Sequence, residues 1–183
     1  MNRSLIKQAD SVLHSGGIIA YPTESCYGLG CDPRNSKAVR TLLQIKHRHW
    51  NKGLILIAAS VDQLYPYIDK EQLNKEKVLL SWPGPTTWIL PATENVSHYL
   101  RGQHDGIAVR VTSHPVANLI CRSFRGPIVS TSANPEGHPP ALSANGVRRY
   151  FADKVSIVVE GPLGELDSPT PIYDAMTGKC LRS

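Results

Sequence analysis

The chain has 183 residues, of which 41% are hydrophobic and 19% charged, and its formal net charge is +5. This composition excludes a disordered chain, and no stretch approaches the roughly 20 apolar residues that a membrane-spanning helix needs. The length is enough for one substantial core, so we expect a single domain over residues 1–183 that has no membrane partner.

The four cysteines, Cys26, Cys31, Cys121 and Cys180, form no C-x-x-C pair. Charged residues interrupt the N-terminal segment, so it does not resemble a secretory signal. These features favour a cytoplasmic protein with reduced, unpaired thiols and no metal site.

The predicted elements begin with a helix over residues 4–14, where apolar residues recur at helical spacing. The apolar run 17–21 predicts a buried strand, and residues 22–30 are predicted as a loop. A second helix should begin at Asn35 or Ser36 and fray near His47. A second buried strand is then expected over residues 54–59.

The rest of the chain continues to alternate between the two kinds of element. Further helices are predicted over residues 62–68, 71–81, 116–124 and 143–151. Further strands are predicted after the stiff turn 82–85, over 107–112, 127–130 and 155–159, and around the Thr177-Gly178 turn of the tail. This interleaving indicates an α/β fold rather than an all-β fold.

A basic segment separates the second helix from the second strand. It reads Lys46-His47-Arg48-His49-Trp50-Asn51-Lys52, and no Asp or Glu occurs anywhere from Pro33 to Val61. Lysine supplies a compact charge and arginine a forked donor, a combination that suits phosphate groups. The segment is interpreted either as a solvated basic surface or as an anion site.

Two other segments carry polar groups where strands should end or expose a face. Arg110 projects from a predicted strand, where it needs either an anionic ligand or a nearby carboxylate as its partner. Residues 130–134, Ser-Thr-Ser-Ala-Asn, follow a strand and form either a ligand-binding edge or a polar turn. His114, before Pro115, is equally compatible with a helix cap and with a catalytic base.

Common catalytic and nucleotide-binding motifs are absent. The sequence has no G-x-x-x-x-G-K-[ST], no G-x-G-x-x-G that opens a helix, no H-E-x-x-H and no G-x-S-x-G. If the ligand is a nucleotide, side chains must therefore supply the contacts that a glycine-rich loop supplies elsewhere.

Taken together, the motifs closely resemble the YrdC family, and within it the short bacterial form. They are P-T-E at 22–24, K-x-R at 46–48, K-G-L at 52–54, W-P-G-P at 82–85, A-V-R at 108–110 and S-T-S-A-N at 130–134. The resemblance runs from about Gly17 to Arg182. It departs from the family pattern at His49, where proline is usual, and at Ile57 and Tyr173.

The resemblance implies a fold and an activity. The fold would be a twisted, mixed, open α/β sheet with flanking helices around a large positively charged cavity. The activity would be nucleotidyl transfer, in which L-threonine, bicarbonate and ATP give threonylcarbamoyl-AMP and pyrophosphate. ATP would be a substrate accompanied by Mg²⁺, and the product would serve tRNA modification, with tRNA or tRNA-modification proteins downstream.

The resemblance also implies roles for individual residues. Lys46 and Arg48 would be catalytic and contact the phosphates. ATP would further contact Lys52, Arg110, Ser132, Asn134 and Arg182. Threonine would contact Thr23, Ser25, Ser130 and Ser168.

Two other functions remain in competition. The net positive charge and three tryptophans also allow an RNA-binding module without catalysis, although core packing is the more usual role of tryptophan beside proline and in apolar runs. A related carbamoyl-transfer module, as in hydrogenase maturation proteins, is the second, but the chain lacks the cysteine pairs of the zinc-finger-like segments that accompany such modules.

Overall fold

The computed structural model of the protein describes residues 3–73 and 76–183. Within these ranges the strands form one mixed sheet in the order β7-β1-β2-β6-β3-β5-β4-β8-β9. The strands are β1 (Ile19–Pro22), β2 (Tyr27–Gly30), β3 (Ile55–Ala58), β4 (Thr87–Pro91), β5 (Gly106–Val111), β6 (Ile128–Ser132), β7 (Ile157–Val158), β8 (Ile172–Asp174) and β9 (Cys180–Arg182).

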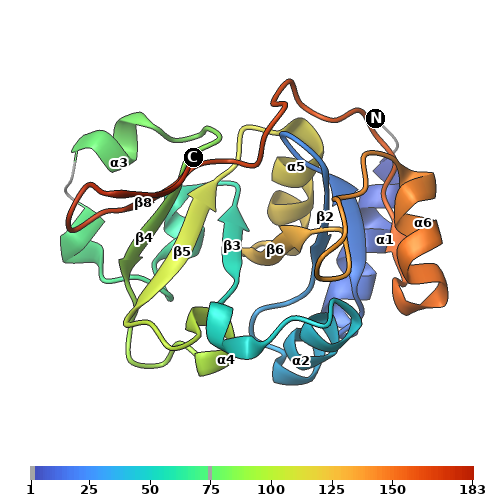
Figure 1. Ribbon diagram of the computed structural model, residues 1–183, viewed down its shortest axis with the longest axis horizontal. Coiled ribbons are helices and arrows are strands. Elements are labelled where there is room, and N and C mark those ends of the chain that lie inside the picture. The colour runs from blue at the N-terminus through green and yellow to red at the C-terminus, as the bar shows by residue number, and fades with distance from the viewer. Residues whose placement is uncertain (1–2, 74–75) are drawn as a thin grey trace.

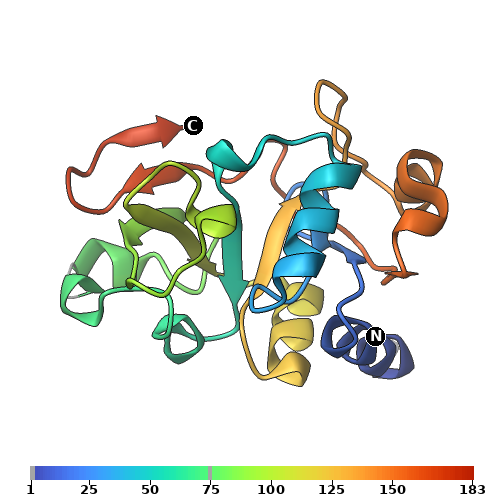
Figure 2. The same cartoon turned by 90° about the horizontal axis from the view of Figure 1, so that it is seen from below.

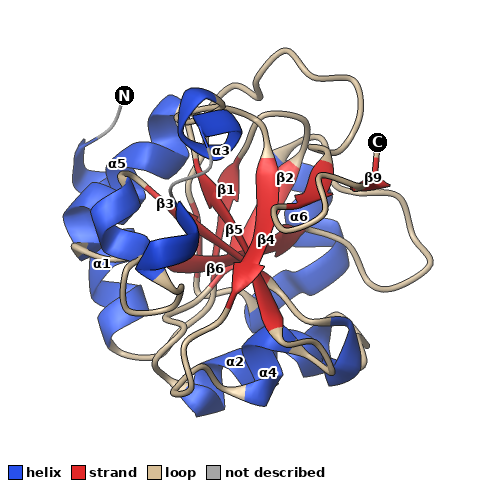
Figure 3. Cartoon of the chain, turned by 90° about the vertical axis from the view of Figure 1, so that its left-hand side faces the viewer, coloured by secondary structure: helices blue, strands red, loops and turns tan. Residues whose placement is uncertain are grey.

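Helices surround this sheet, as Figures 1 and 3 show. The α-helices are α1 (Arg3–His14), α2 (Ser36–Ile45), α3 (Glu76–Leu80), α4 (His98–Arg101), α5 (Pro115–Phe124) and α6 (Ala144–Phe151). The 3-10 helices are η1 (Trp50–Lys52), η2 (Val61–Leu64), η3 (Lys70–Leu73) and η4 (Ala152–Lys154). The predicted twisted, mixed α/β sheet with flanking helices is confirmed. No helix of the described ranges is long and apolar enough to cross a membrane.

Some predicted elements were wrong in type or extent. The predicted loop 22–30 contains β2, which pairs antiparallel with β1 from Pro22↔Tyr27 to Ile19↔Gly30. Glycine is rare in strands, so the sequence around Gly28 and Gly30 does not predict one. The predicted helix 62–68 is only the short η2, which ends at Leu64. Pro66 follows closely and has no N–H group with which to extend the helix.

Three further segments differ from the sequence prediction. The short α4 was not predicted, since four residues show no helical period. The predicted strand 155–159 is reduced to β7. The predicted helix 71–81 includes residues 74 and 75, which lie outside the described residues, and η3 and α3 flank them.

Two hydrophobic cores pack on the sheet. The larger one includes the buried faces of α2 and α6. The smaller one joins α1 and α5 to strand residues such as Ile57 and Ile128, which are register partners on β3 and β6. Side chains two residues apart share a face of a strand. Ile55 and its register partner Ser130 therefore lie on the same face of the sheet as Ile57 and Ile128. Both line a cavity, which therefore lies where α1 and α5 leave the sheet uncovered.

Candidate ligand-binding cavity

The cavity has a volume of about 260 Å³. Its apolar floor comes from the sheet and includes Ile55, Ile89, Ala108 and Ile172. Most of the predicted site residues line its walls, namely Thr23, Ser25, Arg48, Lys52, Arg110, Ser130, Ser132 and Arg182. The fold thus brings together side chains that are up to 159 positions apart in the sequence, from Thr23 to Arg182.

The basic segment begins at a helix end of defined geometry. His47 has a left-handed backbone (φ 54°), its N–H donates to the Gln44 carbonyl at 3.0 Å, and the Arg48 N–H donates to the Leu43 carbonyl at 2.9 Å. This pair of bonds is the Schellman pattern, which ends a helix and turns the chain sharply. The turn separates Lys46, on the last helical turn, from Arg48, which leaves the helix.

Arg48 is held against the following turn. Its Nε and Nη2 atoms donate to the Gly53 carbonyl at 3.2 and 3.0 Å. Gly53 in turn packs against the C-terminal end of α4, at Leu100 and Arg101, and the Leu54 N–H donates to the Leu100 carbonyl at 2.7 Å. These contacts fix the Arg48 guanidinium in the cavity wall. Figure 2 shows the segment after α2 running past β6 toward β3.

Lys46 was predicted to contact the phosphates, but it does not line the cavity. Only 4% of it is exposed, and its ammonium donates to the Ser132 carbonyl and, at 2.7 Å, to the Asn134 carbonyl. Burial, followed by the charge of Arg48, lowers the pKa of Lys46 to about 8. Lys46 therefore anchors the loop that carries Ser132, directly behind the cavity wall.

Asn134 also lies outside the cavity lining. Its amide nitrogen donates to the carbonyls of Pro135 at 3.1 Å and His138 at 2.7 Å. Asn134 thus stabilises its own loop, as expected if residues 130–134 form a polar turn. Ser132 lines the cavity, as expected if they form a ligand-binding edge.

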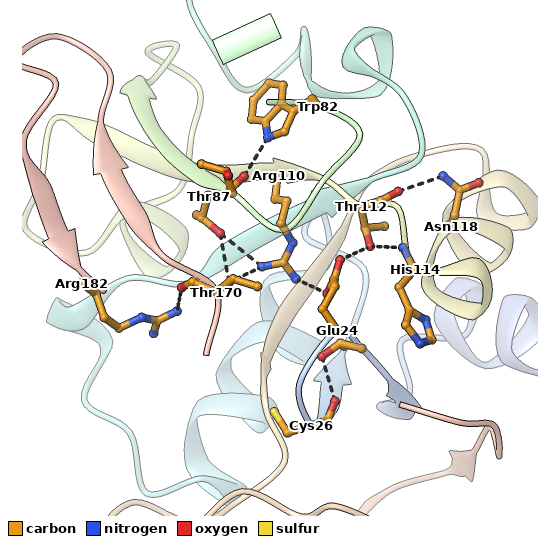
Figure 4. A network of polar contacts seen from close by, with 12 residues as sticks. Glu24, Cys26, Trp82, Thr87, Arg110, Thr112, His114, Asn118, Thr170 and Arg182 are labelled. Atoms are coloured by element: carbon orange, nitrogen blue, oxygen red, sulfur yellow. Dashed lines mark hydrogen bonds and ion pairs between the residues drawn. The ribbon is translucent and has the colours of Figure 1, made fainter. Parts of the chain in front are cut away.

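Arg110 is the centre of a buried polar network, shown in Figure 4. Its Nη2 donates to Glu24 Oε2 at 3.2 Å, and its Nη1 donates to Thr170 Oγ1 at 2.7 Å and to Thr87 Oγ1 at 3.2 Å. Of the two partners considered for Arg110, the carboxylate is thus present, as Glu24. Arg110 nevertheless lines the cavity, and its Nε has no acceptor among the described residues.

The same network continues away from the cavity. Thr112 Oγ1 donates to Glu24 Oε1 at 2.6 Å and accepts from the His114 N–H at 3.1 Å. His114 is 5% exposed, does not line the cavity, and its Nε2 lies 3.2 Å from the Pro162 carbonyl. Burial lowers the pKa of His114, which favours the neutral form of the ring. These contacts support the structural alternative for His114.

The segment between β7 and β8 closes the cavity on the Thr23 side. The Gly164 N–H donates to the Thr23 carbonyl at 3.0 Å, and the Leu166 N–H donates to the Glu24 carbonyl at 3.1 Å. A Cβ atom at Gly164 would lie 2.7 Å from the Glu24 carbonyl oxygen, so only glycine allows this approach. Ser168, on this segment, is exposed and does not line the cavity.

Thr170, which was not among the predicted site residues, lines the cavity, whereas Ser168 does not. Thr170 is 6% exposed, and its carbonyl accepts a hydrogen bond from Arg182 Nη2 at 2.7 Å. Sequence reasoning also missed Cys26, Arg101 and His104, which line the cavity as well. The signal for Thr170 was its position just before β8, whereas nothing in the local sequence distinguished Arg101 or His104.

The cations of the site repel one another. Partial burial lowers the pKa of Arg182, and the charges of Arg110 and Arg48 lower it further. Burial likewise lowers the pKa of Arg48. Such crowding of positive groups is unfavourable unless an anion neutralises it. In the described part of the chain, no group of three or more His, Cys, Asp or Glu side chains could hold a metal ion.

Comparisons with known proteins agree with this geometry. The sequence model of the Sua5/YciO/YrdC family, described as "Telomere recombination", matches residues 11–183. The threonylcarbamoyl-AMP synthase of Coxiella burnetii (strain RSA 493 / Nine Mile phase I) is 49% identical over 180 residues, which cover 97% of this chain and 96% of that protein.

Solved structures show the same fold. A variant of P. abyssi Sua5 (H234A/Y235A) superposes with a TM-score of 0.89 at 30% identity and covers 96% of this chain. P. abyssi Sua5 complexed with L-threonine gives a TM-score of 0.85 at 31% identity over 92% of this chain. The chain spans about half the length of these two proteins, 54% and 50% respectively. On the family match and the close relatives together, the chain belongs to the Sua5/YciO/YrdC family.

Proposed function

We propose that the protein is a nucleotidyltransferase that forms threonylcarbamoyl-AMP from L-threonine, bicarbonate and ATP and releases pyrophosphate. One observation carries the proposal. Arg48, Lys52, Arg110 and Arg182 all line one cavity. An elongated anion such as a triphosphate is the kind of ligand that neutralises several cations at once.

ATP would occupy the side of the cavity formed by the basic segment and the Ser132 loop. Arg48 and Lys52 would contact the phosphates, together with Arg182 from the tail strand. Lys46 would act on ATP indirectly, because its ammonium donates to the carbonyls of Ser132 and Asn134 rather than facing the cavity. Its catalytic contribution would then consist of its charge and of the loop conformation that it maintains.

Threonine would occupy the side lined by hydroxyl groups. Thr23, Ser25, Ser130 and Thr170 line the cavity there, and the Thr23 hydroxyl donates to the Cys26 carbonyl at 2.8 Å. The similarity to Sua5 complexed with L-threonine supports this ligand. We assign Thr170 rather than Ser168 to this pocket, because Ser168 is exposed.

The reaction would proceed in two steps. The threonine amine combines with bicarbonate to give a carbamate and water. A carbamate oxygen then attacks the α-phosphorus of ATP, and pyrophosphate leaves with the electrons of the broken P–O bond. Such a step depends on alignment and on neutralisation of charge more than on a strong base. A cavity with several guanidinium groups and hydroxyls fits this requirement.

Mg²⁺ would enter with ATP as part of the substrate. Since Mg²⁺ commonly keeps several waters and binds mainly through substrate phosphates, the lack of a metal-holding cluster in the described residues is compatible with this arrangement. The product, a mixed anhydride, would serve threonylcarbamoyl transfer to tRNA by downstream proteins.

The test is a pyrophosphate-release assay with ATP, bicarbonate and single amino acids. Release should require bicarbonate and should be greatest with L-threonine. Arg48→Ala should reduce it, whereas Arg149→Ala, an exposed arginine on α6, should not. Tight RNA binding without amino-acid-dependent release would contradict the proposal and favour an RNA-binding module.

A further inference from the structure

Glu136 lies on the loop after β6 and reaches the basic segment at two points. Its carboxylate forms an ion pair with the Lys52 ammonium. Its backbone N–H donates to the Lys46 carbonyl at 2.8 Å. The loop that carries Ser132 is therefore joined to the proposed phosphate-binding segment by one side-chain contact and one backbone contact.

The carboxylate is close to several of the cations that surround the proposed phosphate site. The hydrogen bond from Lys52 lowers the pKa of Glu136 first, and the charges of Lys52, Arg48 and Lys46 lower it further. Glu24, by contrast, is engaged with Arg110 and Thr112. Among the described residues, it is thus the Glu136 carboxylate that contacts the basic segment.

The ion pair itself contributes little to folding. The side chains of Lys52 and Glu136 are 49% and 43% exposed, and exposed pairs of this kind are typically weak. The loop is fixed independently by the backbone bond and by the contacts of Lys46 with Ser132 and Asn134. Removal of the Glu136 charge should therefore leave the loop in place and act mainly on Lys52.

We infer that Glu136 is an affinity-determining residue that competes with the phosphates of ATP for the Lys52 ammonium. The inference rests on the proposed function, in which Lys52 binds phosphate. ATP must then displace the carboxylate, or share Lys52 with it, at the expense of the ion pair. Because the pair is exposed, Glu136→Gln should lower the dissociation constant of ATP by roughly two- to fivefold.

The experiment is a calorimetric measurement of ATP and adenosine binding at low ionic strength. The proteins are the native chain, Glu136→Gln, Lys52→Met and the double variant. Glu160→Gln is the matched control, because Glu160 forms a comparable exposed ion pair with Arg148, which does not line the cavity, whereas Lys52 does. It changes the net charge by the same amount.

The inference predicts four results. Glu136→Gln binds ATP more tightly than both the native chain and Glu160→Gln. Adenosine, which has no phosphate, binds equally to all of these proteins. Lys52→Met binds ATP more weakly, and the addition of Glu136→Gln to it gives no tightening.

The contradicting results separate the two claims. If Lys52→Met weakens ATP binding but Glu136→Gln leaves it unchanged or weakens it, Glu136 is no competitor and the phosphate assignment stands. If Lys52→Met has no effect, Lys52 does not bind phosphate, and both the inference and that part of the proposed function fail.

Discussion

The buried ion pair between Glu24 and Arg110 predicts a large loss of stability on removal of the carboxylate. The two side chains are 8% and 6% exposed, and Arg110 Nη2 lies 3.2 Å from Glu24 Oε2. At this distance two unit charges attract by about 5 kcal/mol with an effective dielectric constant of about 20. Since loss of one partner leaves the other charge buried, we expect Glu24→Ala to lower the free energy of unfolding by about 3–5 kcal/mol.

Equilibrium urea denaturation measures this change. Glu160→Ala, which breaks the exposed pair with Arg148, should change the free energy of unfolding by less than about 1 kcal/mol. Glu24→Ala combined with Arg110→Met should be more stable than Glu24→Ala alone, because the unpaired charge is gone. The reasoning is refuted if Glu24→Ala is no less stable than the Glu160→Ala control.

Three further predictions concern the cavity. Lys46→Ala and Arg48→Ala should each slow pyrophosphate release about tenfold or more, since hydrogen bonds to charged groups contribute about 1.5–3 kcal/mol; near-native rates would contradict their assignment. Because burial and Arg48 lower the pKa of Lys46 to about 8, its charge is lost as the pH rises through that value. ATP affinity of the native chain should therefore fall above pH 8 in calorimetric titrations, and a Lys46→Met variant should bind more weakly without this pH dependence. Thr170→Val should raise the KM for threonine because it removes the hydroxyl bound to Arg110, whereas Ser168→Ala should not; the reverse order would restore the original assignment of Ser168.

The parts of the fold that the sequence predicted well are those with a local signal. The helix 4–14 and the strand 107–112 follow from apolar periodicity. Of the two cap candidates, Asn35 and Ser36, it is Asn35 whose side chain accepts from the N–H groups of Lys37 and Ala38. The β2 strand carries no such signal. A Cβ atom at Gly30 would lie 2.7 Å from the Val129 carbonyl oxygen and 2.9 Å from the Tyr21 ring, so the neighbouring strands require glycine there.

In the candidate site, too, some features follow from the local sequence and others depend on residues that are distant in the sequence. Residue types that bind phosphate indicated the basic segment, and most of its predicted partners line the cavity. The position of Lys46 behind the wall depends on residues 132 and 134, far along the chain, so the local sequence could not predict it. Thr170 rather than Ser168 lines the cavity because of the register of β8 beside β4, which brings Thr170 next to Thr87.

Isotope labelling of the product tests the central claim most directly. The protein is incubated with ATP, L-threonine and ¹³C-bicarbonate, and the nucleotide products are analysed by mass spectrometry. The account predicts an adenylate that contains threonine and one ¹³C atom and that forms together with pyrophosphate. Pyrophosphate release without incorporation of the labelled carbon, or an adenylate of threonine that lacks it, would contradict the account.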